Sequence, residues 1–441
     1  MYVHPATDAL PGEPVRVRAA TGPFLLALLL RAIRVVISVT LSLPFWPLFL
    51  ITVAAWGWPP HLARPSQVAR YLTHAWRETP PEPGIAPLSR VWLILRIVEQ
   101  TSWLAVHGVA WAIDEVLYGR QLDATPVTAP LILLSAARSG STQLSHYLED
   151  DPHLISPITL RAAMPYRWVW VLVEATAARF VSAAWVRARY DAGLPQEMRE
   201  RHEGDPFRTD TFEVLYSGHQ LNRMAGLLGP RVMSEDMVIA SSAPHNRQVW
   251  DHDFVDFIDR LARKTLLHAG PAPDGRPRRF FFKGHFLEAA DALSRRYPDA
   301  RFLTVIREPL GRMQSMLNHL HGNPFGEELG AWPWAWLTQT FVPAEIVYCQ
   351  WEQRWFTAPE GPRRTVVRFK DYVTDLEGTM RRVYRECLDE AELPPHVPIV
   401  HAERERKNYC VNRSLDQLGV DSAAIRSQLA DYVAWCKPPR A

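Results

Sequence analysis

Four short apolar runs stand out along the chain, at residues 131–135, 280–282, 302–306 and 365–369. Each run is too short for an ordinary helix, and the stretches between them have the mixed apolar and polar spacing of amphipathic helices. Near-continuous apolar strands separated by helices are typical of a parallel sheet that is covered on both faces. The pattern therefore predicts a three-layer α/β domain with its ligand site at the carboxyl ends of the strands.

The N-terminal part of the chain has a different pattern. An apolar stretch begins at residue 24, and residues 35–58 contain no charged side chain over 24 positions. In a helix this length is enough for the roughly 30 Å hydrocarbon core of a bilayer. Pro44 and Pro47 lie in the middle of the run, where they would kink or break a helix. Three interpretations stay open: a membrane span, a kinked insertion of residues 24–58 into one leaflet, and a helix of the soluble core.

Proline-rich segments at residues 59–60 and 78–87 indicate linkers. They favour three parts: a membrane-associated segment (1–65), a helical linker region (66–125) and the α/β domain (126–441). Two further apolar, tryptophan-containing stretches, residues 91–117 and 164–185, fit either a membrane interface or core helices.

Composition limits the possible partners. Of 441 residues, 47% are apolar and 22% charged, so the chain can bury one large domain and an appendage. The net charge of +2 argues against a nucleic-acid partner, which requires a dense basic stripe. The four cysteines are far apart, and their spacing fits neither a zinc site nor a disulfide framework. We expect core positions for Cys349, Cys387, Cys410 and Cys436.

The first apolar run leads into the most informative segment, residues 130–150 (PLILLSAARSGSTQLSHYLED). A small polar turn with one glycine here joins a strand-like run to a helix-like one. Such a turn can hold an anion, because the backbone N–H groups at a helix start and the helix dipole favour negative charge. The turn lacks the earlier glycine and the following lysine of a Walker A loop. The residues predicted to contact a phosphate-like group are Arg138, Ser139, Gly140, Ser141 and Thr142.

Two other apolar runs also end in side chains suited to anion chemistry. Arg307 follows residues 302–306, Pro309 fits the first turn of the next helix, and Ser315 lies eight residues past Arg307, where it can face the same anion. Lys283 and His285 follow residues 280–282. Lysine is scarce in this chain, with five in total, which makes a lysine at a strand end more informative.

These three segments, in this order, resemble the PAPS-dependent sulfotransferases, where PAPS is 3′-phosphoadenosine 5′-phosphosulfate. Residues 137–142 (ARSGST) are similar to that family's 5′-phosphosulfate loop, residues 283–285 (KGH) to its K-x-H segment, and residues 297–315 to its 3′-phosphate segment. The resemblance covers about two thirds of the chain, from residue 130 onward, and a weaker similarity at residues 367–372 and 404–418 is to the tail of bacterial members. Ala137, Gln143 and Glu308 depart from the usual residues. The resemblance implies a P-loop NTPase-like sulfotransferase fold for residues 126–441.

The resemblance also implies a division of roles. Sulfuryl transfer from PAPS to a hydroxyl or amine needs a base for the acceptor's proton and cations for the leaving phosphate. His285 would be the base, because histidine ordinarily has a pKa near 6.5. Lys283 and Arg138 would neutralise the leaving 5′-phosphate, which the amides of residues 139–142 would hold. Arg307 and Ser315 would bind the 3′-phosphate, and no metal is expected, since fixed cations do the work of magnesium in kinases.

Other side chains remain as alternative bases. Glu288 lies one turn beyond His285, and some bacterial sulfotransferases use a carboxylate. His146 and Glu149 lie beyond the first turn of the helix that follows the polar turn, where we expect surface positions.

The acceptor would be a small molecule, a glycan or a lipid, entering beside His285 and partly under residues 161–275. Membrane contact by the N-terminal segment would favour a lipid-linked or amphipathic acceptor, with the catalytic domain in the cytoplasm. Two alternative functions are a kinase-like nucleotide-binding enzyme and a non-catalytic membrane-bound binding protein. The kinase-like alternative is disfavoured by the missing Gly-Lys pair and by the lack of a clear strand-end aspartate for magnesium.

Overall fold

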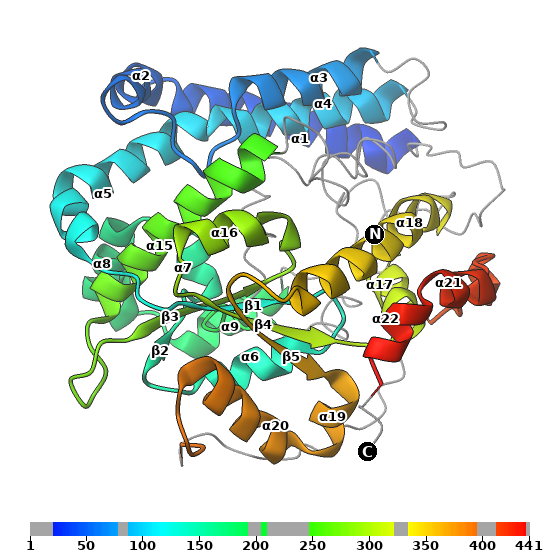
Figure 1. Ribbon diagram of the computed structural model, residues 1–441. Helices are drawn as coiled ribbons and strands as arrows, with labels where there is room; N and C mark the ends of the chain where they lie inside the picture. The colour runs from blue at the N-terminus through cyan, green and yellow to red at the C-terminus, as the bar shows by residue number, and fades with distance from the viewer. Residues whose placement is uncertain are drawn as a thin grey trace.

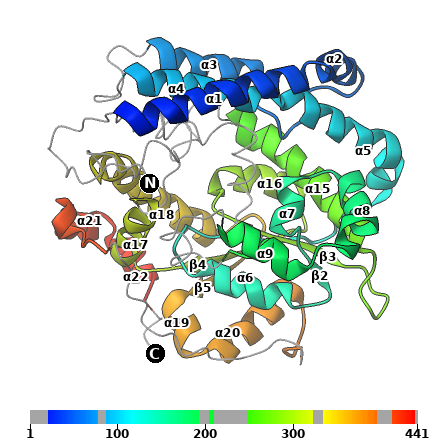
Figure 2. The same ribbon diagram turned by 180° about the vertical axis from the view of Figure 1, so that it is seen from behind.

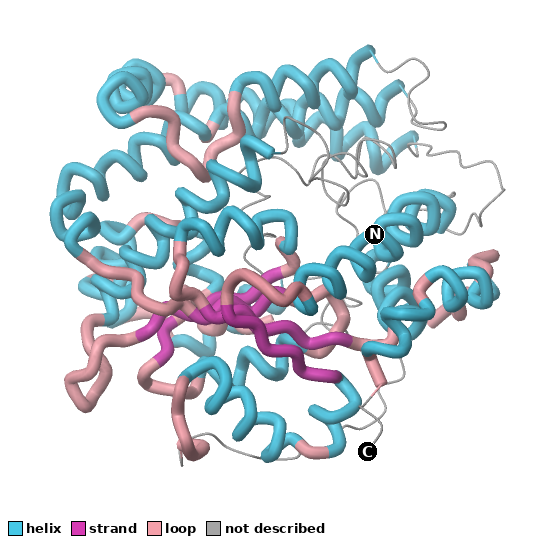
Figure 3. Tube along the Cα trace, viewed as in Figure 1, coloured by secondary structure: helices cyan, strands magenta, loops and turns pink. Residues whose placement is uncertain are grey.

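A computed structural model shows five strands in one parallel sheet, with helices on both faces (Figures 1 and 3). The structure describes residues 21–77, 87–192, 204–209, 247–321, 334–394 and 412–437. The strand order is β2-β3-β1-β4-β5, and every pair is parallel. The strands are β1 (Leu131–Leu134), β2 (Leu154–Ile155), β3 (Arg279–Gly284), β4 (Arg301–Ile306) and β5 (Arg363–Arg368).

All four predicted strands are confirmed, and the three-layer α/β fold with them. The main difference in bounds is at Phe369, which begins helix α19 (Phe369–Thr374) instead of ending β5. The short edge strand β2 was not predicted, because two residues give no periodicity.

Strand β1 explains why these runs are apolar at every position. Its four residues are all fully buried. Because side chains alternate along a strand, Ile132 and Leu134 join the hydrophobic cluster on one face, whereas Leu131 and Leu133 join the cluster on the other. A strand that packs on both faces is therefore mostly apolar.

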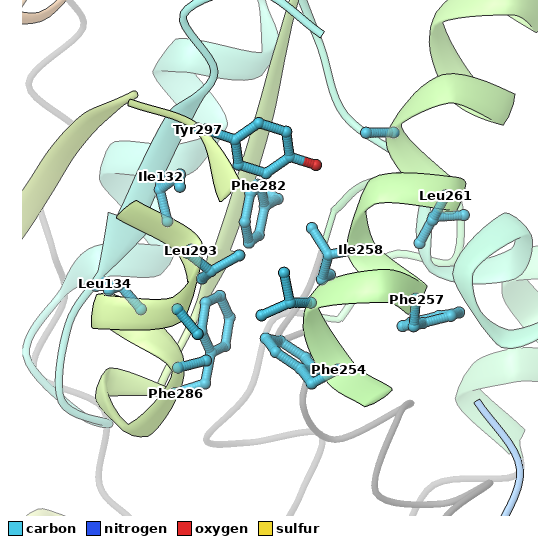
Figure 4. Packing of buried hydrophobic residues seen from close by; sticks show 14 of the residues in the cluster. Ile132, Leu134, Phe254, Phe257, Ile258, Leu261, Phe282, Phe286, Leu293 and Tyr297 are labelled. Atoms are coloured by element: carbon cyan, nitrogen blue, oxygen red, sulfur yellow. The ribbon is translucent and has the colours of Figure 1, made fainter. Parts of the chain in front are cut away.

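Helix α15 (Phe254–Ala269) packs on one face of the sheet through a stripe of large residues (Figure 4). Phe254, Phe257, Ile258 and Leu261 follow the spacing of one helix face and are all buried. The same layer contains η4 (Gln248–Asp253), η5 (Leu287–Ala289), α16 (Ala290–Arg296) and α18 (Trp334–Thr357).

The opposite face is covered by α6 (Ser141–Glu149) and α20 (Leu376–Val383), which contribute Leu144, Leu148 and Met380 to the second cluster. Helix α17 (Pro309–His321) follows β4 and forms a third cluster with α18. The remaining helical segments are α7 (Thr159–Ala163), α8 (Arg167–Ala175), η1 (Ala177–Arg179), α9 (Ala183–Ala192), η6 (Tyr384–Leu388), η7 (Asp416–Leu418), α21 (Ser422–Gln428) and α22 (Ala430–Trp435).

Five helices of the described residues precede β1; in Figure 1 the first four form a layer at the top of the molecule, and α5 runs from this layer down one side. They are α1 (Thr21–Ser42), α2 (Phe45–Trp56), α3 (Pro65–Arg77), α4 (Pro87–Ser102) and α5 (Leu104–Ala124). The predicted break at the prolines is confirmed: Pro44 separates α1 from α2, and Pro47 lies in the first turn of α2, where its missing N–H is tolerated. Residues 35–58 are therefore not one helix. Among the described residues, the helical stretch long and apolar enough to cross a bilayer is Leu25–Ser42.

Helix α5 ties this layer to the sheet domain. Asp114 and Lys264 form a fully buried ion pair, with 2.9 Å between Oδ2 and Nζ. Asp114 also accepts the backbone N–H groups of Arg167 and Trp168 at the start of α8. Trp111 belongs to the main hydrophobic cluster. The division into parts at residues 65 and 125 stays a prediction, and most of residues 193–246, within the predicted acceptor cover, lies outside the described residues.

Gly108 provides a test of how α2 docks on α5. A Cβ at this position would overlap the ring of Phe49, which is fully buried between the two helices. Gly108→Ala should therefore lower the unfolding free energy by about 1–3 kcal/mol, although alanine favours helix. Urea unfolding would measure this, with Gly119→Ala in the same helix as the control, since its Cβ would be in ordinary contact. Equal stability of the two variants would contradict the docking.

Candidate functional site

The loop between β1 and α6 has a backbone that requires two left-handed residues. Arg138 has a φ of 64° and Gly140 a φ of 97°. A Cβ on Gly140 would lie 2.8 Å from two ring carbons of Phe369. Glycine is therefore needed at position 140 both for its φ and for the close approach of the aromatic ring.

Ser139 is the clearest sign that this loop receives a ligand. Its side chain is fully buried, and its hydroxyl has no hydrogen-bond partner within the described part of the chain. The adjacent N-terminus of α6 presents backbone N–H groups that have no partner within the helix. An anion at this point would satisfy both the hydroxyl and the N–H groups.

Lys283 brings a positive charge to the start of α6. It lies on β3, next to Leu133 of β1 in the sheet register, and is fully buried. Its Nζ donates a hydrogen bond to Oγ1 of Thr142 at 2.9 Å. The predicted loop and the predicted lysine are therefore in direct contact.

The third predicted segment reaches the same loop from β4. Arg307 donates from Nη1 to the carbonyl oxygen of Arg138 at 2.9 Å, and its guanidinium lies 4.7 Å from the ring centroid of Phe369. Arg138 in turn donates from Nε to the hydroxyl of Ser315 at 3.1 Å. The residues assigned from sequence to the two phosphate sites thus form one connected group at the carboxyl ends of β1, β3 and β4.

His285 lies just past the end of β3, with its ring held by the main chain. Its Nδ1 is 2.5 Å from the carbonyl oxygen of Ser135. A carbonyl oxygen can only accept, so this contact places the proton of the neutral ring on Nδ1. The other ring nitrogen, Nε2, is then the one that can take up a proton.

Comparison with known proteins agrees with this geometry. A model of the sulfotransferase family matches residues 130–390, which is more than half of the chain. The chain belongs to the sulfotransferase family.

Two solved structures have the same fold as this sulfotransferase. Sulfotransferase STF9 from Mycobacterium avium has a TM-score of 0.58 and 16% identity, covering 88% of this chain and 95% of that one. Sulfotransferase STF1 from Mycobacterium tuberculosis H37Rv has a TM-score of 0.52 and 16% identity, with 87% and 98% covered. Since 88% exceeds the share of residues 130–441, part of the N-terminal helical layer also has a counterpart in STF9. A search of curated proteins found no match.

The alternative bases of the sulfotransferase take different positions. Glu288 lies in η5. Burial raises the pKa of Tyr348, and the negative charges of Glu352 and Glu288 raise it further. His146 and Glu149 are half-buried instead of exposed. Glu149 accepts a hydrogen bond from the backbone N–H of Thr209 at 3.1 Å. No group of three or more histidine, cysteine or acidic side chains that could hold a metal occurs among the described residues.

A buried polar network behind the site was not predicted from the sequence. The hydroxyl of Thr304 on β4 donates to Oε1 of Glu352 at 3.0 Å, and Oε2 of Glu352 accepts from Tyr432 at 2.6 Å and from Arg312 at 3.3 Å. Arg312 and Glu352 are both fully buried. Arg312 is three residues before Ser315 on α17, so the network fixes the helix that carries Ser315.

The strength of this network can be tested by Thr304→Val. The change keeps the side chain's shape but leaves a buried carboxylate oxygen without its donor, which should lower the unfolding free energy by about 1.5–3 kcal/mol. Thr338→Val is the matched control, because the buried Thr338 hydroxyl donates to main-chain carbonyls and its loss should cost about 0.5–1.5 kcal/mol. Urea unfolding would measure the unfolding free energy of both variants. If Thr304→Val lost no more unfolding free energy than Thr338→Val, the network would not have the stabilising role proposed for it.

Glu149 should make stability depend on pH. Burial raises its pKa to about 7 against the opposing charges of Arg208 and Lys283. The folded protein therefore keeps this proton up to about pH 7, whereas the unfolded chain releases it near pH 4.5, so the ionised group destabilises the fold above that range. Glu149→Gln should raise the unfolding free energy at pH 8 by on the order of 1 kcal/mol or more and change it little at pH 4.5.

The measurement is urea unfolding at the two pH values. Glu360→Gln is the control, since Glu360 is exposed. A stabilisation of equal size at both pH values would show that proton linkage at Glu149 is not the cause.

Proposed function

We propose that this sulfotransferase moves the sulfuryl group of PAPS to a hydroxyl or amine of its acceptor, with His285 taking the acceptor's proton. The main support for the proposal is that residues from the ends of β3 and β4 and from α17 contact the loop between β1 and α6. Arg138, Lys283 and Arg307 bring positive charge to the start of α6, where the hydroxyl of Ser139 is buried without a partner in the described structure. Such a site fits a phosphate ester better than a neutral ligand.

Each residue of the group has a proposed task. The amides of residues 139–142 would hold the 5′-phosphate, and Lys283 and Arg138 would stabilise the charge that develops there. Arg307 and Ser315 would bind the 3′-phosphate and so orient the cofactor. PAPS, when bound, supplies the sulfuryl group to be transferred. No metal has a part in this proposal.

The hydrogen bond of His285 with Ser135 supports its proposed role as a general base. The carbonyl of Ser135 fixes the ring and keeps Nδ1 protonated, which leaves Nε2 to accept a proton from the acceptor. The imidazolium formed on proton transfer would be stabilised by the same carbonyl, since a hydrogen bond to a charged donor is stronger.

The N-terminal segment gives an indication of the type of acceptor. We propose that residues 24–58 contact a membrane, with the catalytic domain on the cytoplasmic side. Only 17% of the stretch Leu25–Ser42 is buried, whereas a core helix of a soluble protein would be mostly buried. This favours a lipid-linked or amphipathic acceptor over a freely soluble one.

The test is calorimetric binding of 3′-phosphoadenosine 5′-phosphate, without metal, to wild type, Arg307→Ala and His285→Ala. Arg307→Ala should weaken binding by roughly tenfold to a hundredfold, because charge-assisted hydrogen bonds to the phosphate are lost. His285→Ala should bind almost as wild type does, because its task lies on the acceptor side.

Arg385→Ala removes an exposed arginine of η6 and serves as the control, because residues in η6 and next to it contact Arg279 and Arg301 at the amino ends of β3 and β4. No binding by wild type would overturn the sulfotransferase proposal and favour a non-catalytic membrane-bound binding protein. Equal binding by Arg307→Ala would reject the assignment of the 3′-phosphate site.

A further inference from the structure

Helix α1 is inverted relative to a helix of a water-soluble protein. The buried positions on its inner side are polar: Arg31, Ser38 and Ser42 are each at most 6% exposed. Its outer side is aliphatic, with exposed fractions between 46% and 65% at Leu25, Leu26, Leu29, Leu30, Ile33, Val36, Ile37 and Leu41. A surface helix in water has the reverse arrangement, so this outer side is built for an apolar medium.

The polar inner side of α1 is bound to α4. Arg31 forms an ion pair with Glu99, and its guanidinium lies 4.8 Å from the ring centroid of Trp92. Helix α4 is in turn packed against α3 on another side. The three helices are therefore one layer, with α4 in the middle and α1 and α3 at its two edges.

This packing determines how α1 can meet a membrane. If α1 crossed the bilayer, α4 would be carried into the hydrocarbon with Arg90, Arg96 and Glu99, and α3 would follow. Ionisable groups at that depth cost several kcal/mol each. An orientation parallel to the surface instead places the aliphatic side in the lipid and keeps α4 outside.

We infer that α1 lies in the plane of the lipid–water interface and does not span the bilayer, which makes the protein monotopic. The inference rests on the membrane contact proposed above and adds the insertion geometry. Helix α2 turns away from α1 after Pro44, since it is seen end-on where α1 is seen from the side (Figures 1 and 2). It adds exposed apolar side chains at Leu48, Leu50 and Ile51, while Phe49 points into the protein.

A second surface, formed by the end of α8 and by α9, has the composition of an interfacial contact. Helix α9 has no buried residue, Phe180 is 88% exposed and Trp185 is 55% exposed. Arg179 and Arg189 lie among these aromatic residues, and the Arg189 guanidinium is 5.4 Å from the Trp185 ring centroid. Both α1 and α9 lie on the side of the molecule that faces the viewer in Figure 2.

The occupant that fits both surfaces is a bilayer containing anionic lipid. Aromatic side chains favour the headgroup region, and the adjacent arginines attract phosphate headgroups. Arg34, half-exposed on α1 at 3.7 Å from Glu99, adds a further cation at the edge of the aliphatic side.

The aliphatic surface is tested by flotation with vesicles of phosphatidylcholine and phosphatidylglycerol in a 70:30 ratio, the ratio being about that of a bacterial-like anionic surface. The variant is the double substitution Leu30→Glu with Ile37→Glu, seven residues apart on the exposed side. It should weaken vesicle binding at least roughly tenfold, since two charges replace two aliphatic side chains that would enter the lipid. Trp76→Glu on α3 is the matched control, because Trp76 is 69% exposed but lies beyond α4.

The orientation of α1 is tested with a protease site fused before Met1 in the full-length protein bound to sealed vesicles. A helix in the interface leaves this site on the outside, so cleavage should proceed without detergent. Cleavage that occurs only after detergent is added would show that α1 spans, and would overturn the inference.

The contribution of α9 is tested by Arg189→Gln on the same vesicles, since Arg189 is exposed on this helix. Loss of one cation near the surface should weaken binding by roughly fivefold, and the effect should vanish on pure phosphatidylcholine. Arg385→Gln, the same change on a distant surface, is the control. An equal effect of both changes would remove α9 from the proposed contact.

These outcomes are separate from those of cofactor binding. Tight binding of 3′-phosphoadenosine 5′-phosphate with no vesicle binding would retain the sulfotransferase proposal and overturn this one. A wild-type dimer in lipid-free solution that Leu30→Glu with Ile37→Glu converts to a monomer, again without vesicle binding, would assign the surface to a second copy of the chain.

Discussion

Every polar backbone and side-chain atom of Ser135 is engaged with a neighbouring strand or with the site. Its N–H donates to the carbonyl of Gly284 at 3.2 Å, its hydroxyl accepts from the N–H of Val305 at 2.8 Å, and its carbonyl accepts from His285. One residue thus joins the carboxyl ends of β1, β3 and β4. The anion-binding loop begins directly after it, so the positions of the loop, of Lys283 and of Arg307 all depend on this junction.

The junction also links the two halves of the chemistry. The proposed base is held by the carbonyl of Ser135, and the loop that would hold the leaving phosphate starts one residue later. The proposed base and the loop proposed to hold the phosphate are therefore both attached to this one residue. Behind it, the fully buried Arg312 and Glu352 tie β4 to α17 and α18, and removing either partner would leave a buried charge without compensation.

The sequence was sufficient for the parts of the fold that depend on local pattern. The four main strands could be predicted because each is buried on both faces and is therefore mostly apolar. The loop at residues 137–142 could be predicted because a small polar turn with a glycine, placed between a strand and a helix, favours an anion. The contacts of His285 with Ser135, and of Thr304 with Glu352, join residues 150 and 48 positions apart, which no local pattern reports. Glu149 was expected at the surface because α6 has polar residues there, but Thr209, about 60 positions away, covers it.

His61 joins the N-terminal helical layer to the sheet domain. It is fully buried, its ring is stacked 4.6 Å from that of Trp111, and its Nε2 is 3.2 Å from the hydroxyl of Tyr166, which also bonds to His107. Together with the buried pair of Asp114 and Lys264, these contacts pack the segment after α2 against the sheet domain. With the layer at a membrane, the proposed base His285 would stand at a fixed height above the bilayer, and the enzyme would select acceptors by how far their reactive group extends from the lipid surface.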